Sequence, residues 1–349
     1  GKSHICRIIA SKQVPGNSSD QVFRHGEWWK RTVSCGPRSV PWEDGSRWHL
    51  VLERGSLDGL HILPDPSTLL GEYDDFLQVR VVAVGLNFRD VLNVLDQYPG
   101  NPGPPGSDCA GIVERVGKNV TGFEVGDAVV GIIQGCIRSV CWANPRLLVK
   151  MPLDLSFKDA AALPVVGSTV VLALEELAQI SPGQRAVVHT ASGGVGTFAV
   201  KYLLRHGVAV FATASTPEKQ QYLLDLGVAK VASSRDSEDY ETSLAAWCEQ
   251  EGPPDIVLNS LSGEFIRISL QYMADRGLFV ELGKRGVWSS EKVAKAAPDV
   301  CYHLVALDDI VQQNPDRFHS LLVRALQIVE EDSLVLPVTT FGGDDRVRQ

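Results

Sequence analysis

The sequence of 349 residues lacks a surplus of positive charge. Lysine and arginine number 33 against 42 aspartates and glutamates, which gives a net charge of −9. A chain without broad positive potential has no general attraction for nucleic-acid phosphates or anionic lipid headgroups. We therefore expect no nucleic-acid partner and no membrane partner.

Long apolar runs are also lacking. The most apolar stretch, residues 160–174, contains Pro164 and Gly167 and is shorter than the roughly 20 residues that span a bilayer as a helix. It is expected to lie in a protein core. The first ten residues show no signal-peptide pattern, and because residue 1 is glycine we expect a domain excised from a longer protein.

No two cysteines have the C-x-x-C spacing of metal and redox sites. An odd number of dispersed cysteines is typical of reduced thiols in a cytosolic protein. We therefore expect a cytoplasmic protein in which the cysteines act as small buried apolar residues. They are Cys6, Cys35, Cys109, Cys136, Cys141, Cys248 and Cys301.

The length and composition that remain are those of an ordinary globular chain with two folding units, because 349 residues exceed what one core usually organises. In the first part, short apolar runs alternate with turn clusters, and residues 76–84, 111–113 and 127–133 read as strands. This pattern predicts a β-rich, barrel-like domain.

The sequence pattern changes near residue 156 from short strands to alternating helices and strands. Helices are predicted over 159–177 and 196–206, and they flank a buried strand predicted over 186–189. Further strands are predicted over 208–213, 230–232, 255–259 and 278–282. Alternating strands and helices predict a parallel, doubly wound sheet. After about residue 300 the chain is expected to leave this sheet, with a helix over 315–331 and a strand over 334–338 returning to the first domain.

A glycine-rich loop, HTASGGVG at 189–196, follows the buried strand and opens a helix. Glycines in this context let backbone N–H groups approach a pyrophosphate at the positive end of the helix. Ala191 replaces the first glycine of the usual G-x-G-x-x-G pattern, so the loop alone is a weak signal.

The next strand ends at Ser215 without the carboxylate that usually accepts hydrogen bonds from the ribose of NAD. Lys219 and Arg235 follow at positions where they could meet a 2′-phosphate, although a lone basic residue is usually a solvated surface charge. The combination favours NADPH over NADH.

Five segments together resemble the enoylreductase domains of polyketide synthases and animal fatty acid synthases, which belong to the zinc-independent part of the medium-chain dehydrogenase/reductase superfamily. They are GLNFRDVLNVLDQYPG at 85–100, GSDCAGIVERVG at 106–117, HTASGGVG at 189–196, SSRD at 233–236, and DIVLNSLSGE with FVELGK between 255 and 284.

The resemblance implies an α/β fold made of a GroES-like β-barrel substrate domain and a Rossmann domain, with the active site between them. We expect residues 1–166 with 301–349 to form the substrate domain and residues 167–300 to form the NADPH-binding domain. Zinc-dependent relatives need Cys and His ligands. Here Gly106, Ser107 and Asp108 occupy the position of the dehydrogenase G-H-E segment, so we expect no metal.

The implied activity is oxidoreduction of a CH–CH bond, namely NADPH-dependent reduction of an α,β-enoyl thioester on an acyl carrier protein. The implied partners are that carrier domain and other domains of a multifunctional megasynthase. The resemblance allows a homodimer, but the residues do not decide the oligomeric state, the acyl chain or the stereochemistry.

Carried over from the resemblance, the catalytic residues are Lys284, Asp308 and Tyr98. Lys284 could instead be a surface lysine, Asp308 a helix cap, and Tyr98 an aromatic packing beside Pro99. Arg89 is expected to organise the loop beside the nicotinamide together with Asn87. The residues expected to bind the cofactor are Asn87, His189, Gly193, Gly194, Val195, Gly196, Ser215, Lys219, Arg235, Asn259, Leu261, Leu282 and Gly283.

Two alternatives stay open. A free-standing quinone oxidoreductase shares the glycine loop and also lacks zinc. A catalytically silent synthase domain would keep the fold and only bind cofactor or act as a scaffold.

Overall fold

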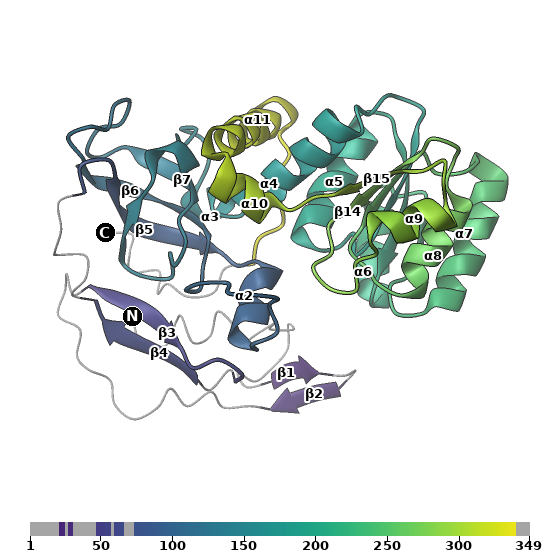
Figure 1. Cartoon of the computed structure of the whole chain (residues 1–349), viewed down its shortest axis with the longest axis horizontal. Coiled ribbons are helices and arrows are strands. Elements are labelled where there is room, and N and C mark those ends of the chain that lie inside the picture. The colour runs from purple at the N-terminus through teal and green to yellow at the C-terminus, as the bar shows by residue number, and fades with distance from the viewer. Residues whose placement is uncertain (1–20, 25–26, 31–46, 57–58, 66–72, 340–349) are drawn as a thin grey trace. The chain divides into compact units, whose positions relative to one another are not determined.

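The computed structural model describes residues 21–24, 27–30, 47–56, 59–65 and 73–339 (Figure 1). Internal contacts divide the chain into two units, Gly1–Ala162 with Pro337–Gln349 and Leu163–Leu336. Two units are what the chain length leads one to expect, and the first boundary lies close to the predicted one.

The first unit contains a five-stranded antiparallel sheet in the order β8-β5-β6-β7-β9. Its strands are β5 (Leu77–Gly85), β6 (Asp108–Val116), β7 (Ala128–Ile132), β8 (Val140–Ala143) and β9 (Leu148–Lys150). Two hairpins accompany it, β1 (Gln21–Arg24) with β2 (Glu27–Lys30) and β3 (Trp48–Leu52) with β4 (Leu60–Pro64). The short helical segments are α2 (Phe88–Val94), η3 (Pro145–Leu147) and α3 (Phe157–Ala160). The predicted β-rich first domain is confirmed.

Cysteines contribute to the core of this sheet. Cys109, Cys136 and Cys141 are buried among Leu77, Val79, Val113 and other apolar side chains, and burial raises the pKa of the Cys136 thiol. The expectation that the cysteines are small buried apolar residues is confirmed for these three. It is wrong for Cys301, which is exposed. Cys6 and Cys35 lie outside the described residues.

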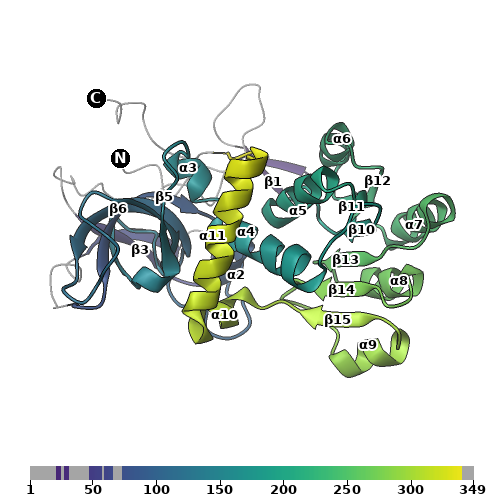
Figure 2. The ribbon, with the colours of Figure 1, turned by 90° about the horizontal axis from the view of Figure 1, so that it is seen from above.

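The second unit contains a parallel sheet of six strands in the order β12-β11-β10-β13-β14-β15 (Figure 2). The strands are β10 (Arg185–Val188), β11 (Ala209–Ala214), β12 (Lys230–Ser233), β13 (Ile256–Asn259), β14 (Leu278–Glu281) and β15 (Cys301–Leu304). The predicted doubly wound sheet is confirmed. The order reverses between β10 and β13, the point where such sheets bind ligands beyond the carboxyl ends of their strands.

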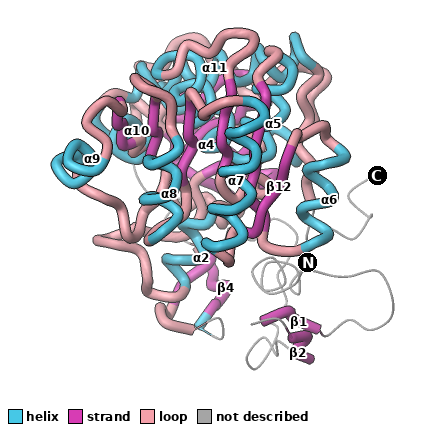
Figure 3. Tube along the Cα trace, turned by 90° about the vertical axis from the view of Figure 1, so that its right-hand side faces the viewer, coloured by secondary structure: helices cyan, strands magenta, loops and turns pink. Residues whose placement is uncertain are grey.

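Helices alternate with these strands, as the cyan and magenta segments of Figure 3 show. They are α4 (Pro164–Val170), which continues as the π-helical η4 (Val171–Leu177), α5 (Gly194–Arg205), α6 (Pro217–Asp225), α7 (Ser237–Glu251), α8 (Glu264–Tyr272), α9 (Ser290–Ala296), α10 (Leu307–Gln313) and α11 (Pro315–Asp332). Within this unit, α7, α8 and α9 cover one face of the sheet, and α4 and α5 lie on the other (Figure 2). Among the described residues, no helix has the length and apolar character that a membrane span requires.

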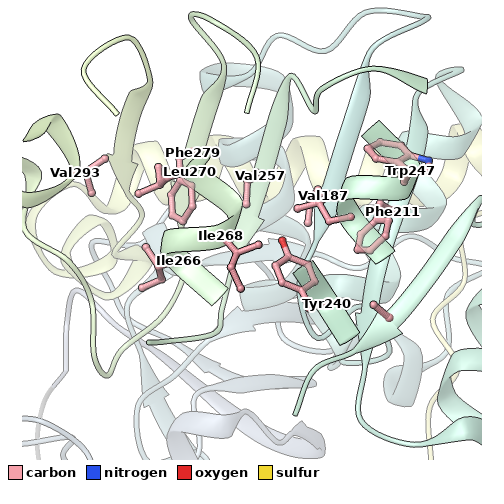
Figure 4. Packing of buried hydrophobic residues seen from close by; sticks show 12 residues of the cluster. Val187, Phe211, Tyr240, Trp247, Val257, Ile266, Ile268, Leu270, Phe279 and Val293 are labelled. Carbon is pink, nitrogen blue, oxygen red and sulfur yellow. The ribbon is translucent and has the colours of Figure 1, made fainter. Parts of the chain in front are cut away.

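The core between the sheet and α7, α8 and α9 is built around large side chains, including Phe211, Tyr240, Trp247 and Phe279 (Figure 4). Because strands covered on both faces are apolar throughout, they read as continuous hydrophobic runs in the sequence. This explains why the sequence located them.

Three predictions about this unit are wrong. Cys301–Leu304 pairs with β14 as a sixth strand, and α10 and α11 pack on α4, so residues 301–336 belong to the second unit and not to the first. Residues 334–338 form no strand. The helix predicted over 159–177 is divided before Pro164, which occupies the first turn of α4, because proline has no N–H to continue a preceding helix.

Candidate active site

The glycine loop connects β10 to α5 by a turn that only glycine fits at one position. Thr190 adopts a positive φ of 47°, and Gly193 is the N-cap of α5. A Cβ atom at Gly196 would lie 2.5 Å from the Cα of Ala191, which is closer than real contacts allow. Gly196 therefore lets the first turn of the helix pack directly on the loop.

The amino end of α5 is open to a ligand. Gly193 and Gly194 are exposed, and no described side chain caps this end of the twelve-residue helix. The first backbone N–H groups of a helix have no partner within the helix, and together with the helix dipole they favour an anion. These residues fit the pyrophosphate of a dinucleotide.

Neighbouring strands hold the loop from both sides. The N–H of Thr190 donates to Thr213 Oγ1 (3.0 Å), and the N–H of Ala191 donates to the carbonyl of Thr213 (2.9 Å). On the other side, Thr190 Oγ1 lies 2.6 Å from Ser260 Oγ. The loop is therefore fixed to the end of β11 and to the segment that follows β13, at the reversal of the strand order.

His189 and Asn259, both predicted to bind the cofactor, have buried side chains that face each other. His189 Nδ1 lies 2.6 Å from Asn259 Oδ1, and the two residues are 2% and 0% exposed. Burial lowers the pKa of His189 to about 4, although the hydrogen bond to Asn259 opposes this. The imidazole is therefore neutral near neutral pH, and it supports the loop from beneath.

Ser215, Lys219 and Arg235 lie at one edge of the sheet. Ser215 directly follows β11, Arg235 follows the adjacent strand β12, and Ala214 pairs with Ser233. The N–H of Lys219 donates to the side chain of Thr216, which caps α6. The structure thus places Lys219, in the first turn of α6, and Arg235, both predicted to meet a 2′-phosphate, after neighbouring strands together with the predicted cofactor residue Ser215.

Lys284 and Asp308 form an ion pair. Lys284 Nζ donates to Asp308 Oδ2 at 3.3 Å, and the side chains are 35% and 30% exposed. Lys284 follows β14, and Asp308 lies in the first turn of α10, just after β15. Such exposed pairs contribute about 0 to 1 kcal/mol to stability. Because both side chains are partly exposed, both groups are accessible to a ligand at the carboxyl edge of the sheet.

Leu261, Leu282 and Gly283 are half-buried in the segments after β13 and β14, and Val195 is half-buried in the first turn of α5. The N–H of Leu282 donates to the carbonyl of Asn259 (2.7 Å). The structure thus places the predicted cofactor residues of the second unit along the carboxyl ends of β10, β11, β12, β13 and β14.

Asn87, Arg89 and Tyr98 lie in the first unit, around α2. The Arg89 guanidinium lies over the Tyr98 ring, 5.5 Å from its centroid, and it donates to the carbonyl of Pro102 (2.7 Å). Asn87 caps α2, and its N–H donates to Asp90 Oδ2 (2.9 Å). The predicted role of Arg89 in organising this loop is consistent with these contacts.

Asp90 is the buried anchor of the same loop. Its Oδ1 accepts the N–H of Gly106 (2.8 Å), and burial raises the pKa of the carboxyl while these backbone hydrogen bonds oppose the rise. Asp108, in the segment that corresponds to the G-H-E of dehydrogenases, is buried and accepts from Ser107 Oγ (3.0 Å). Within the described ranges, no group of three or more His, Cys, Asp or Glu side chains is arranged to hold a metal.

Comparison with known proteins gives the family. Residues 74–152 match the alcohol dehydrogenase GroES-like domain family, and residues 194–326 match the family described as zinc-binding dehydrogenase. The crystal structure of CurK enoyl reductase superposes with a TM-score of 0.76 and 34% sequence identity, over 84% of this chain and 91% of CurK. The chain belongs to the enoyl reductase family.

The chain is also similar to polyketide synthases. It is 40% identical over 293 residues to the pikromycin polyketide synthase component PikAII of Streptomyces venezuelae, a match that covers 82% of the chain but only 8% of PikAII. The chain therefore spans a small part of the curated relative that it matches. Its fold is shared with Escherichia coli quinone oxidoreductase complexed with NADPH, at a TM-score of 0.72 and 23% identity over 84% of this chain and 90% of that one.

Sequence reasoning missed three residues that contact the predicted site residues or the glycine loop. Thr213 holds the glycine loop, Tyr240 lies 3.0 Å from His189 Nε2, and Glu281 accepts from Asn259 Nδ2 at 2.6 Å. Glu281 gave a signal that could have been used, because it is a carboxylate at the end of the otherwise apolar strand LFVE. A charge at such a position is expensive to bury without partners.

Proposed function

We propose that this chain reduces an α,β-enoyl thioester to the saturated acyl thioester with NADPH, and that an acyl carrier protein carries the acyl group. The observation that supports it is the arrangement of the second unit. An open glycine turn after β10 and the Lys284–Asp308 pair beyond β14 and β15 lie at the carboxyl edge of one parallel sheet.

The residues that would hold NADPH lie along this edge of the sheet. The backbone at Gly193 and Gly194 would receive the pyrophosphate, and Ser215, Lys219 and Arg235 would recognise the 2′-phosphate. The absence of a carboxylate over residues 212–215 supports NADPH over NADH, because a carboxylate there would repel the phosphate. The E. coli protein with the same fold is complexed with NADPH, so the fold accommodates this cofactor.

When bound, NADPH supplies a hydride to the β-carbon of the alkene. The chain must then stabilise negative charge on the thioester oxygen and deliver a proton to the α-carbon. Lys284 Nζ is the proposed donor, and Asp308 orients it through the hydrogen bond at 3.3 Å. Tyr98 is a second candidate donor. Because Lys284 is 35% exposed, water can return the proton after each turnover.

The proposed partners are a carrier domain and the other domains of a polyketide synthase. The match to PikAII supports this, because the chain corresponds to 8% of that synthase component. Lys284 and Asp308 would then act on a substrate that is delivered on a neighbouring domain.

Steady-state kinetics of the purified chain test the function. We expect NADPH-dependent reduction of crotonyl thioester and little reduction of quinones. Turnover of quinone alone would favour the quinone oxidoreductase alternative. Binding of NADPH, followed by fluorescence, without turnover of any acceptor would favour the silent domain.

A further inference from the structure

Glu281 ends β14 as a fully buried carboxylate with two short hydrogen bonds. Its Oε1 accepts the N–H of Gly283 (2.6 Å), and its Oε2 accepts from Asn259 Nδ2 (2.6 Å). Gly283 directly precedes Lys284. The carboxylate therefore connects the turn that carries Lys284 to the end of β13.

Asn259 uses its whole side chain in this region. Its Nδ2 also donates to the carbonyl of Leu261 (2.9 Å), and its Oδ1 accepts the N–H of Leu261 (3.1 Å). Both amide hydrogens are thus directed at acceptors, which fixes the orientation of the amide. The backbone of Leu261, a predicted cofactor residue, is held at both its N–H and its carbonyl.

The orientation of the amide determines the hydrogen on His189. Because Asn259 Oδ1 is an acceptor, His189 Nδ1 must be the donor across their 2.6 Å contact, and Nε2 of the neutral ring is then an acceptor. The Tyr240 hydroxyl lies 3.0 Å from Nε2 and donates to it. Tyr240 in turn lies 2.7 Å from Ser269 Oγ.

The hydrogen bonds therefore run in one direction, from Tyr240 through His189 and Asn259 to the carboxylate of Glu281. Aligned bonds of this kind strengthen one another in a low dielectric. This series of hydrogen bonds links three segments of the candidate site, namely the glycine loop that begins at His189, the Asn259–Leu261 segment and the turn at Gly283. Glu281 accepts hydrogen bonds from the last two segments, through Asn259 Nδ2 and the N–H of Gly283.

We propose that Glu281 is a positioning residue that holds the Gly283 backbone, and through it Lys284, in place against the Asn259–Leu261 segment. This rests on the proposed function. An apolar residue at this position would be easier to bury, since a carboxylate in a core is costly unless it is fully hydrogen-bonded. The turn is also fitted to the carboxylate, because a Cβ at Gly283 would lie 2.6 Å from Glu281 Oε1.

Glu281→Gln tests the proposal with almost no change in shape. A glutamine can accept from Gly283 or from Asn259, but its NH₂ group then faces the other donor. We expect kcat on crotonyl thioester to fall about tenfold to a hundredfold, as misplacement of a catalytic group by about 1 Å does, and by a larger factor than KM for NADPH rises.

Glu175→Gln is the matched control. Glu175 lies in η4 and accepts from Tyr202 Oη (2.6 Å) and Arg324 Nη2 (2.9 Å), so it is a carboxylate of the same unit whose hydrogen bonds among the described residues go to α5 and α11 and not to the predicted site residues. Its replacement should leave kcat unchanged. If kcat fell in both variants in proportion to the fall in their melting temperatures, Glu281 would have only a stabilising role and the proposal would be overturned.

A reversed pair supplies the rescue. In Asn259→Asp with Glu281→Gln, the glutamine NH₂ can donate to the new aspartate and its oxygen can accept from Gly283, so both bonds of residue 281 return, while the bond from residue 259 to the carbonyl of Leu261 is lost. The comparison is Asn259→Asp alone, which lacks the same Leu261 bond and opposes two carboxylates, and we expect the double variant to have the higher kcat. Failure of the double variant to exceed Asn259→Asp alone would argue against positioning by these bonds.

Amide hydrogen exchange in the absence of cofactor gives a readout that does not depend on activity. Exchange at Gly283 should be faster in Glu281→Gln and slower again in the double variant. If the wild-type chain does not reduce enoyl thioesters, the proposed function fails while this measurement still tests the link. An active wild type with unchanged kcat in Glu281→Gln overturns the positioning role.

If Glu281→Gln does not fold, Gly283→Ala replaces it. This change keeps the carboxylate but directs a methyl group at Oε1, so the same loss of kcat is expected. Wild-type kcat in Gly283→Ala would overturn the proposal.

Discussion

Lys284 and Asp308 form an ion pair beyond the carboxyl ends of β14 and β15. In the proposed function, Lys284 donates the proton and Asp308 orients the Lys284 ammonium group. We expect Lys284→Ala to lower kcat on crotonyl thioester more than it raises KM, since the proton is needed mainly in the transition state. General-acid catalysis contributes roughly 100-fold to 10,000-fold, and water can replace part of it at an exposed site. Tyr98→Phe should cost less than Lys284→Ala.

Lys230→Ala is the control for this series, because Lys230 is exposed at the amino end of β12, the end of the sheet opposite the carboxyl edge. Its kcat should equal that of the wild type. If Lys284→Ala, Asp308→Ala and Tyr98→Phe all kept the wild-type kcat, the three catalytic assignments would be wrong while the cofactor site could stand.

The second prediction concerns Lys219 and Arg235, which are proposed to recognise the 2′-phosphate of NADPH. Replacing both with alanine should raise KM for NADPH at least about tenfold, since a charge-assisted bond to phosphate contributes about 1.5 to 3 kcal/mol. KM for NADH should hardly change, because NADH lacks the phosphate. Equal use of NADPH and NADH by the wild-type chain would contradict the proposed recognition.

His189 makes the stability of the chain depend on pH. Its pKa falls from the ordinary value near 6.5 to about 4 in the folded chain, so its contribution is present above about pH 6.5 and is lost as pH falls toward 4. Between about pH 7 and pH 5 the loss is about 2 kcal/mol for this group. Urea unfolding at both pH values should show it.

His189→Gln is the comparison that isolates this effect, because glutamine has no proton to gain. The difference in unfolding free energy between the two pH values should be about 2 kcal/mol smaller in the variant. Glu281 acts in the opposite sense, since burial raises its pKa, and it is present in both proteins. Equal pH dependence of the two would contradict the neutral, buried state of His189.

At the scale of elements, the turn between β10 and α5 depends on Gly196. Gly196→Ala would place a methyl group 2.5 Å from Ala191 Cα, and relief of such overpacking costs about 1 to 3 kcal/mol. We expect a lower melting temperature and weaker NADPH binding, measured by fluorescence titration. Gly193→Ala is the control for stability, because the nearest atom to a Cβ added at Gly193 is the carbonyl oxygen of Thr190, at 3.3 Å.

How far the elements could be predicted depends on their burial. β10, β11, β13 and β14 are buried on both faces and gave clear apolar runs. β15 did not, because its residues Cys301, His303 and Leu304 are exposed at the edge of the sheet, and so the tail was wrongly assigned to the first domain. A single proline explains the division of the helix predicted over 159–177.

Short motifs in the sequence were enough to predict residues of the candidate site, whereas contacts between distant residues were missed. Gly193, Gly194 and Lys284 could be located from their motifs, and the structure brings Lys284 to Asp308 across 24 positions. Tyr240 lies 51 positions from His189, which it contacts, and it reads as one more aromatic core residue. Such partners depend on how α7 packs on the sheet, which local patterns do not specify.

At the scale of the whole molecule, the chain corresponds to 8% of PikAII, and its proposed substrate is tethered to a neighbouring domain. A tether converts binding into an intramolecular step with an effective concentration of about 1 mM for a short flexible linker. Tight binding of the free thioester would then bring no benefit, so weak affinity for small mimics is expected.

We therefore expect KM for crotonyl N-acetylcysteamine in the range of about 1 mM or above, with turnover that does not saturate at lower concentrations. The same crotonyl group on a carrier domain fused to the chain should be reduced at a rate that does not depend on protein concentration, because delivery is intramolecular. The control is the same fusion protein with no crotonyl group attached to its carrier domain, so that the group can only be offered free. If the free mimic already saturated at micromolar concentration, as about −8 kcal/mol of binding would allow, delivery by a tether would be unnecessary and a free-standing reductase would be the better description.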